Sequence, residues 1–239
     1  FFESMSGITT TGSTILISIE ASPPGILVWR SLLQWLGGIG VIVMAIAIFP
    51  MLSVGGMQLF KAENFENPEK VVPRATSLTR GIFIIYSVLT LIWASLLYLS
   101  GMSSFDSILH SMTTIATGGY STKSGSIGAF NSQLIDWIII LGMIFGSLPF
   151  VHYLAMTKGS YRDLIKDSQV RWFLVLLTIL VLTIFSLLFL NGTYDWKDSI
   201  RYSAFNVTSI LTGTGYGTAD FGLWGGFAPT ILLLCMFIG

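Results

Sequence analysis

KDSIRYSAFNVTSILTGTGYGT (Lys197–Thr218) is the last of three stretches that share one pattern. The earlier two are FFESMSGITTTGST (Phe1–Thr14) and FDSILHSMTTIATGGYST (Phe105–Thr122). Each has an acidic residue followed by Ser near its start, continues through a short apolar or small-residue segment, and ends in a cluster of Thr and Gly. Self-similarity at a long period indicates a repeated structural unit. We therefore expect a short helix followed by a Thr/Gly loop, repeated along the chain.

The composition places the chain in a lipid bilayer. Hydrophobic residues make up 53% of the sequence, charged residues only 10%, and the mean hydropathy is +0.77. Soluble domains carry about 25% charged residues, and a helix needs about 20 apolar residues to cross a bilayer. The charge-free runs predict four complete spans and one that is cut short, so we interpret the chain as a fragment. The spans lie at about Trp29–Pro50, Gly81–Ser100, Leu134–Met156, Trp172–Leu190 and Gly222–Gly239.

The basic residues predict the orientation of these spans. Eight of the twelve lie in the connections Met51–Arg80 and Thr157–Arg171. Cytoplasmic connections are enriched in Lys and Arg, so we expect both connections in the cytoplasm and the three Thr/Gly loops on the outer side. The formal net charge is zero, so the bulk charge does not favour binding of nucleic acid.

The segments before the Thr/Gly clusters are about half as long as a bilayer-spanning helix. Irregular backbone at membrane depth is tolerated where it is buried in protein or lines a watery cavity. We therefore expect re-entrant hairpins around a pore. Glycine lets successive carbonyls face one axis, Thr adds a hydroxyl oxygen, and such oxygens can replace the water shell of a potassium ion. Divalent cations favour carboxylates, which are missing from Ile8–Ser13, Ile115–Tyr120 and Ile210–Gly217, so an alkali cation fits best.

Thr214-Gly215-Tyr216-Gly217 resembles the potassium-channel filter sequence TVGYG. Together with WRSLLQWLGGIGVIVMAIAIFPMLSVGGMQLFKAE (Trp29–Glu63) and MIFGSLPFVHYLAMTKG (Met143–Gly159), the filter segments resemble the Trk/Ktr/HKT superfamily of potassium transporters, most closely its bacterial Trk branch. The resemblance covers nearly the whole chain. By that resemblance the potassium-binding filter positions are Thr9, Thr10, Thr11 and Gly12; Ala116, Thr117, Gly118 and Gly119; and Thr212, Gly213, Thr214, Gly215 and Tyr216.

The resemblance also implies an architecture and partners. Members have four repeats of membrane helix, pore helix, filter loop and membrane helix in fourfold pseudo-symmetry. By that pattern residues 1–66 are the end of repeat one, 67–160 are repeat two, and 161–239 are a truncated repeat three, with the fourth repeat missing. The resemblance further implies a homodimer and a cytoplasmic ring of nucleotide-binding regulatory subunits. No cofactor is implied for this chain, because potassium is the substrate.

The register of the third loop is open from the sequence. Aligning the isoleucines Ile8, Ile115 and Ile210 pairs Gly12 with Gly119 and Thr214. Aligning the tyrosines that follow the loops pairs Gly119 with Gly215 instead. We expect one extra residue in the third loop.

Other polar residues have alternative interpretations. We interpret Arg30 and Asp136, at the outer ends of spans, as interfacial anchors. A second hypothesis is an acidic outer mouth that concentrates cations. Its residues would be Glu20, Asp106, Asp136, Asp195, Asp198 and Asp220. His110, His152 and Cys235 are interpreted as packing or hydrogen-bonding residues, because none has a metal-binding partner at a suitable spacing.

The sequence thus predicts an all-α integral membrane protein that takes up potassium across the bacterial inner membrane. A sodium-selective carrier, or one coupled to sodium or protons, on the same scaffold is the first alternative. A membrane-embedded enzyme that uses a Thr-rich loop as its pocket is a more remote alternative. The sequence shows no catalytic constellation of a nucleophile and a base, so we expect no enzymatic activity.

Overall fold

The computed structural model describes residues 1–52, 71–157 and 159–238. Within these ranges the regular structure is helical throughout, as predicted. The helices are α1 (Phe2–Ile8), α2 (Pro24–Leu52), α4 (Val71–Leu99), α5 (Ser104–Ile115), α6 (Gln133–Ser147), α7 (Phe150–Thr157), α8 (Tyr161–Lys166), α9 (Ser168–Leu190), α10 (Trp196–Leu211) and α11 (Ala228–Cys235), with 3-10 turns η2 (Ser126–Phe130) and η3 (Phe221–Leu223).

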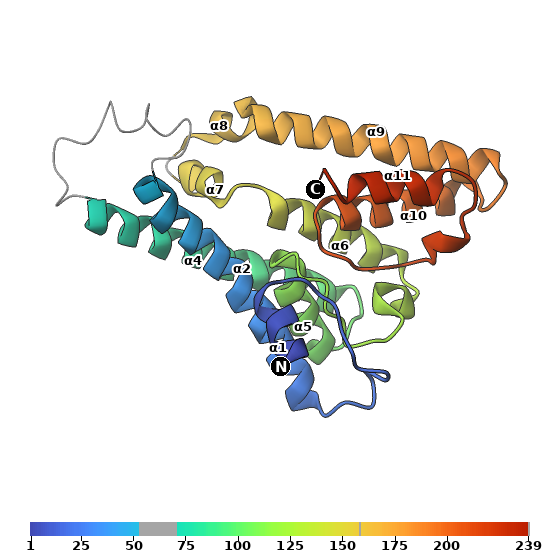
Figure 1. Cartoon of the computed structure of the whole chain (residues 1–239), viewed down its shortest axis with the longest axis horizontal. Helices are drawn as coiled ribbons and strands as arrows, with labels where there is room; N and C mark the ends of the chain where they lie inside the picture. The colour runs from blue at the N-terminus through green and yellow to red at the C-terminus, as the bar shows by residue number, and fades with distance from the viewer. Residues whose placement is uncertain (53–70, 158, 239) are drawn as a thin grey trace.

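Among the residues that the structure describes, three helices are long and apolar enough to cross a membrane. They are α2 over Pro24–Met44, α4 over Leu78–Leu99 and α9 over Ser168–Leu190. Their mean hydropathies are 1.6, 2.2 and 3.0. These helices confirm the first, second and fourth predicted spans as helices. In Figure 1, α2 crosses α4, and α8 and α9 run along the opposite side of the molecule.

The third predicted span, Leu134–Met156, is not one straight helix. It divides into α6 and α7, which meet at an angle of 89°. Pro149 causes the break, because a proline lacks the N–H group and disfavours helical dihedrals in the residue before it, and Leu148 has an extended ψ of 148°. The missing N–H would have paired with the carbonyl of Phe145. The Tyr153 hydroxyl donates to that carbonyl instead, at 2.8 Å.

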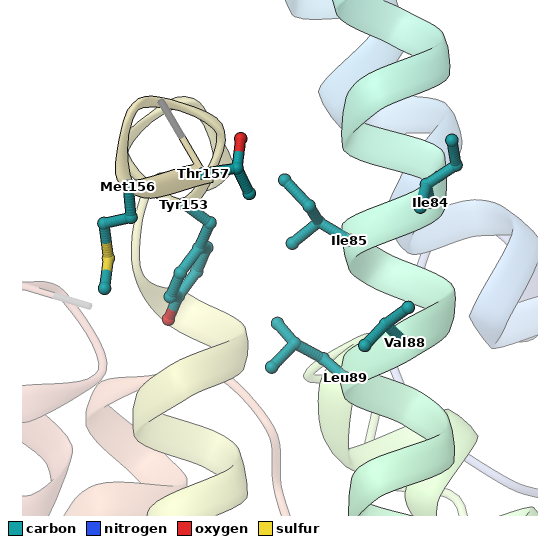
Figure 2. Close-up of a pocket in the computed structure, with 7 residues that line it drawn as sticks. All are labelled: Ile84, Ile85, Val88, Leu89, Tyr153, Met156 and Thr157. Carbon is teal, nitrogen blue, oxygen red and sulfur yellow. The ribbon is translucent and has the colours of Figure 1, made fainter. Parts of the chain in front are cut away.

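The break turns α7 across α4. A shallow apolar groove lies between these two helices, and Figure 2 shows Ile85 and Leu89 of α4 pointing towards Tyr153 and Thr157 of α7. His152 of α7 lies 3.1 Å from the Asp167 carboxylate. The same carboxylate caps the first turn of α9, so His152 connects α7 to the beginning of the next long helix.

The last predicted span also differs from its prediction. A helix does not begin at Gly222: the chain forms η3 there and then turns through Gly225 and Gly226, both of which have positive φ. Helix α11 begins only at Ala228 and has eight residues. The glycine pair delays the helix because glycine favours turn conformations over helical ones.

The short helices α1, α5 and α10 lead into the Thr/Gly clusters. They have 7, 12 and 16 residues, so α10 is longer than the half-length helix expected from the sequence. Ser103 and Asp195 cap the N-termini of α5 and α10 with side-chain oxygens that accept backbone N–H groups. Helix α5 packs against α4, and α10 packs against α9. In addition, α2 packs against α5, and α6 packs against α10. Helices α5 and α10 therefore each contact the long helix that follows the previous Thr/Gly loop, which is α2 for α5 and α6 for α10.

Candidate functional site

In each loop a hydroxyl group on the preceding short helix closes the turn. The hydroxyl donates to the backbone carbonyl seven residues further along the chain. The pairs are Ser6 and Ser13 (2.6 Å), Thr113 and Tyr120 (2.9 Å), and Ser209 and Tyr216 (2.7 Å). All three donors are buried. We call Ser6, Thr113 and Ser209 the anchor residues, because this bond defines the same register in each loop.

The backbone twists in the same way after each anchor residue. The dihedral φ is positive at the fourth and at the sixth following residue. The values are +55° and +78° at Thr10 and Gly12, +48° and +76° at Thr117 and Gly119, and +70° and +84° at Gly213 and Gly215. The fifth following residue does not have a positive φ, so the sign of φ alternates along each loop. A β-branched residue with positive φ is a conformational outlier, and such strain clusters at functional sites.

The common register corrects one expectation from the sequence. Gly12, Gly119 and Gly215 are equivalent, since each lies six residues after its anchor and has positive φ. The residue equivalent to Ile8 and Ile115 in the third loop is therefore Leu211 rather than Ile210. The prediction of an extra residue in the third loop, which followed from aligning the isoleucines, was wrong. The structure instead agrees with the alignment of the tyrosines, which pairs Gly119 with Gly215.

The loops approach one another through their glycines. A Cβ atom placed on Gly12 would lie 2.3 Å from the carbonyl oxygen of Gly118, and one on Gly119 would lie 1.9 Å from that of Thr214. No side chain fits at either position. Each contact joins the sixth position of one loop to the fifth position of the next loop. The three loops therefore converge, and they follow one another in the same sense.

Two tyrosines repeat this head-to-tail relation. The Tyr120 hydroxyl donates to the backbone carbonyl of Glu3 at 3.1 Å. The Tyr216 hydroxyl lies 3.4 Å from the carbonyl of His110 and forms a short contact with the Thr113 hydroxyl. Glu3 and His110 are equivalent, three residues before their anchors, so each tyrosine reaches the same place in the preceding hairpin. A head-to-tail contact of this kind generates a ring when its rotation closes.

A further side-chain hydrogen bond closes each hairpin, which comprises a short helix and the Thr/Gly loop that follows it. The residue three positions before the anchor bonds to a hydroxyl beyond the loop. The pairs are Glu3 and Thr14 (2.7 Å), His110 and Ser121 (2.9 Å), and Asn206 and Thr218 (3.1 Å). His110 is thus a hydrogen-bonding residue. Within the described ranges, no group of three His, Cys, Asp or Glu residues could hold a metal ion.

The second loop differs from the other two in its side chains. In the first and third loops, threonines at the third and fifth positions form hydroxyl pairs. These are Thr9 with Thr11 and Thr212 with Thr214, at 2.8 Å in both cases. The second loop has Ala116 and Gly118 at these positions. It therefore lacks the internal hydroxyl pair that the first and third loops contain.

Gln34 of α2 supports the second loop instead. Its side chain is completely buried. The amide Nε2 donates to the Gly118 carbonyl at 2.6 Å, and the amide oxygen accepts the backbone N–H of Tyr120 at 3.0 Å. Gln34 was not among the predicted site residues, although an amide within a long apolar run was an available signal.

Arg30 and Asp136 are buried rather than interfacial, with 1% and 3% of their surfaces exposed. The interpretation of both as interfacial anchors was wrong. Arg30 donates to the Glu3 carboxylate at 2.8 Å, and its guanidinium carbon lies 4.0 Å from the ring centre of Tyr120. Asp136 pairs with Arg201 at 3.1 Å. Neighbouring elements cover both charges, which sequence position alone did not reveal.

The acidic residues of the predicted mouth all have partners within the chain. Their carboxylates form ion pairs, cap helices or accept from nearby hydroxyl groups. The partners are Ser124 for Glu20, Ser103 and Thr122 for Asp106, Arg201 for Asp136 and Asp198, and backbone N–H groups for Asp195 and Asp220. A role of these residues in concentrating cations stays a prediction.

Comparison with known families identifies the chain. The family described as TrkH, cation transport protein, matches residues 1–239. The chain belongs to the TrkH family. A solved TrkH structure supports the membership: the potassium transporter TrkH from Vibrio parahaemolyticus aligns with a TM-score of 0.87 and 34% identity, over 98% of this chain and 48% of that chain.

Curated TrkH-family relatives match the whole of this chain. The Trk system potassium uptake protein TrkI of Halomonas elongata is 43% identical over 239 residues, and TrkH of Escherichia coli strain K12 is 39% identical over 244 residues. The alignments cover 100% of this chain and 48% and 50% of those proteins. The chain therefore spans about half the length of these relatives.

Proposed function

We propose that the protein takes up potassium ions across a membrane through a filter formed by the three converging loops. The observation that carries this proposal is the contact of Gly12 with the Gly118 carbonyl, which recurs between Gly119 and the Thr214 carbonyl. This repetition brings carbonyl-rich loops to one place in one rotational sense. The solved and curated relatives bear the names of potassium transport or uptake proteins, which supports transport rather than catalysis.

The proposed filter binds the ion with neutral oxygens. Its ligands are backbone carbonyls and Thr hydroxyls of the residues predicted above, from Thr9–Gly12, Ala116–Gly119 and Thr212–Tyr216. Rings of such oxygens can replace the hydration shell of potassium. A divalent ion requires charged oxygen ligands more strongly, and the carboxylate of Glu3 is already bonded to Arg30. The proposed substrate is therefore an alkali cation, and potassium is the choice that the relatives' names support.

A fourth hairpin would complete the ring. Gly215 occupies the same position as Gly12 and Gly119, yet a Cβ placed on it meets none of the described residues within 4 Å. We propose that the carbonyl of a fourth loop lies against Gly215 in the whole protein. The segments 1–66, 67–160 and 161–239 would then be parts of three of four repeats. The boundary at residue 66 lies outside the described residues.

The proposed path leads from the outer face through the filter into the cell, driven by the electrochemical gradient. The basic connections between α2 and α4 and between α7 and α9 would face the cytoplasm. They would offer a surface to regulatory subunits, and the whole protein would form a homodimer. The name Trk system, which the relatives carry, fits a membrane subunit of a larger assembly.

Uptake of ⁸⁶Rb⁺ by the whole protein in liposomes tests this function. We expect uptake that potassium inhibits at lower concentration than sodium does. Gly215→Ala tests the fourth hairpin, because an added methyl group would clash with the proposed carbonyl and abolish uptake. Sodium uptake without rubidium uptake would refute the potassium assignment and favour the sodium carrier. Normal uptake by Gly215→Ala would leave the proposed fourth contact without support.

A further inference from the structure

We propose that Gln34 sets the ion selectivity of the second loop by holding the Gly118 carbonyl, although it lies outside the Thr/Gly clusters. This inference rests on the proposed function. Gln34 is a positioning residue: its side chain contacts the loop through two hydrogen bonds. The first and third loops use their own threonine pairs at the corresponding positions. The second loop uses an amide from α2 in their place.

The two hydrogen bonds determine how the amide is oriented. A backbone N–H can only donate, so the Tyr120 N–H requires the amide oxygen of Gln34 on its side. The Gly118 carbonyl can only accept, so it requires the amide nitrogen. Both requirements are met at once, at 3.0 and 2.6 Å. Rotation of the amide by half a turn would break both bonds, and Gln34 therefore has one stable arrangement.

The absence of a side chain at Gly118 leaves room for this amide. A Cβ atom on Gly118 would lie 2.5 Å from the Gln34 amide carbon and 2.6 Å from its oxygen. The φ of Gly118 is not positive, so the space taken by Gln34, rather than the backbone conformation, excludes a side chain. The equivalent residues in the first and third loops, Thr11 and Thr214, carry side chains that form the hydroxyl pairs with Thr9 and Thr212.

The Gly118 carbonyl lies at the junction of two loops. It is the oxygen that approaches Gly12, at a position where the proposed filter binds the ion. A donor at 2.6 Å occupies one lone pair and restrains the oxygen. Selectivity depends on the field strength and mobility of the coordinating carbonyls. A restrained oxygen with a weaker field disfavours the smaller sodium ion, which must draw its ligands closer.

Burial makes this support necessary. Gln34 has no exposed surface, and a buried donor or acceptor that loses its partner is costly. Loss of the amide would free the Gly118 carbonyl and leave the Tyr120 N–H without a partner. We expect the second loop to bind sodium better and potassium less specifically after this change.

The test compares Gln34→Met with wild type in the whole protein. Methionine has a similar length and shape but lacks the amide donor. The readout is the ratio of sodium to potassium concentrations that halve ⁸⁶Rb⁺ uptake into liposomes. We expect this ratio to fall about fivefold for the lost bond to Gly118. The control is Thr90→Val: the Thr90 hydroxyl of α4 accepts from Trp35, the neighbour of Gln34 on α2, and donates to the Tyr86 carbonyl rather than to a loop. The ratio of this variant should not change.

The outcomes separate this inference from the proposed function. Absence of ⁸⁶Rb⁺ uptake in the wild type would refute the function itself. Uptake in the wild type together with an unchanged ratio in folded Gln34→Met would overturn the role of Gln34 alone. A slower uptake at an unchanged ratio would assign Gln34 a structural role only, and would also overturn the proposal.

A second variant covers the case in which Gln34→Met does not fold. Gly118→Ala should disrupt the loop by colliding with the Gln34 amide, and Gln34→Ala in the same chain should relieve that collision. We expect the double variant to assemble as judged by size-exclusion chromatography, with a lowered selectivity ratio. Failure of the double variant to assemble, or a wild-type ratio in it, would overturn the proposal.

Discussion

The second and third loops share one backbone conformation, but different parts of the molecule hold them. The second loop is enclosed by neighbours: Gln34 bonds to it, and Gly119 lies against the Thr214 carbonyl. At the corresponding positions the third loop uses its own side chains, the Thr212–Thr214 hydroxyl pair, and the described residues leave open space beside Gly213 and Gly215. The same twist can therefore arise from contacts between elements or from local side-chain chemistry.

The largest loss of stability should come from adding a methyl group where the second and third loops are closest. Gly119→Ala places a Cβ 1.9 Å from the Thr214 carbonyl at a φ of +76°. We expect it to lower the free energy of unfolding by about 4 kcal/mol or more, because the main chains must separate. Gly213→Ala is the control. Its position in the other loops is occupied by Thr, and only the positive φ is strained, at about 1–2 kcal/mol. Thermal unfolding in detergent checks both; equal losses would show that the two loops are equally crowded.

The next largest loss of stability is expected when Arg30, whose guanidinium contacts the Tyr120 ring, loses its charge. Arg30→Met leaves the Glu3 carboxylate without its ionic partner, and the loss should be about 3–5 kcal/mol, as for other buried pairs broken on one side. The double variant Arg30→Met/Glu3→Gln should recover part of this loss, because it removes the uncompensated charge. A double-mutant cycle on the unfolding midpoint measures the coupling. Additive losses would mean that Arg30 and Glu3 do not stabilise each other.

The two tyrosine hydroxyls test whether the hairpins are joined by equivalent contacts. Tyr120→Phe and Tyr216→Phe each remove hydrogen bonds to the preceding hairpin. Each should cost about 1 kcal/mol, and the two losses should add, because the contacts lie in separate junctions. Unfolding of the single and double variants gives the comparison. A strong effect from only one tyrosine would show that the junctions are not equivalent.

The smallest effect on stability is expected from Glu20, an exposed residue that bonds to Ser124 in the segment after the second loop. Hydrogen bonds from the Ser124 hydroxyl and N–H lower the pKa of Glu20, so the ionised form is favoured in the folded state. This contribution is present above the ordinary carboxyl pKa, about 4.3, and is lost as the pH falls through the lowered value. The difference in unfolding midpoint between wild type and Glu20→Gln should therefore be found at neutral pH and vanish on acidification. A difference that persists at low pH would rule out this origin.

The sequence was most informative where structure is local. Clusters such as Thr9–Gly12 predicted loops because glycine and threonine act on their own backbone, and the charge-free runs predicted three long helices. Pro149 was a local signal of the break between α6 and α7 that the length of the apolar run obscured. The delayed start of α11 likewise followed from the glycine pair before it.

Contacts between distant segments could not be predicted from the sequence. Gln34 is 84 residues from Gly118 along the chain, and nothing in the spacing of residues joins the two. Arg30 was predicted to be interfacial because the sequence shows that it lies at the end of a span. The sequence does not show that the Glu3 and Tyr120 side chains cover it. The sequence left the loop register open for a related reason, because the bond from Ser209 to the Tyr216 carbonyl that decides it forms only in the folded hairpin.

Composition and repetition by themselves determined that this chain is helical, apolar and built around three Thr/Gly loops, because hydrophobicity and dihedral preference are properties of single residues. Tertiary structure alone decided that the loops meet head to tail and that an amide from α2 replaces a threonine pair in one of them. Those features depend on atoms from separate helices lying within hydrogen-bond distance, and only packing establishes that proximity.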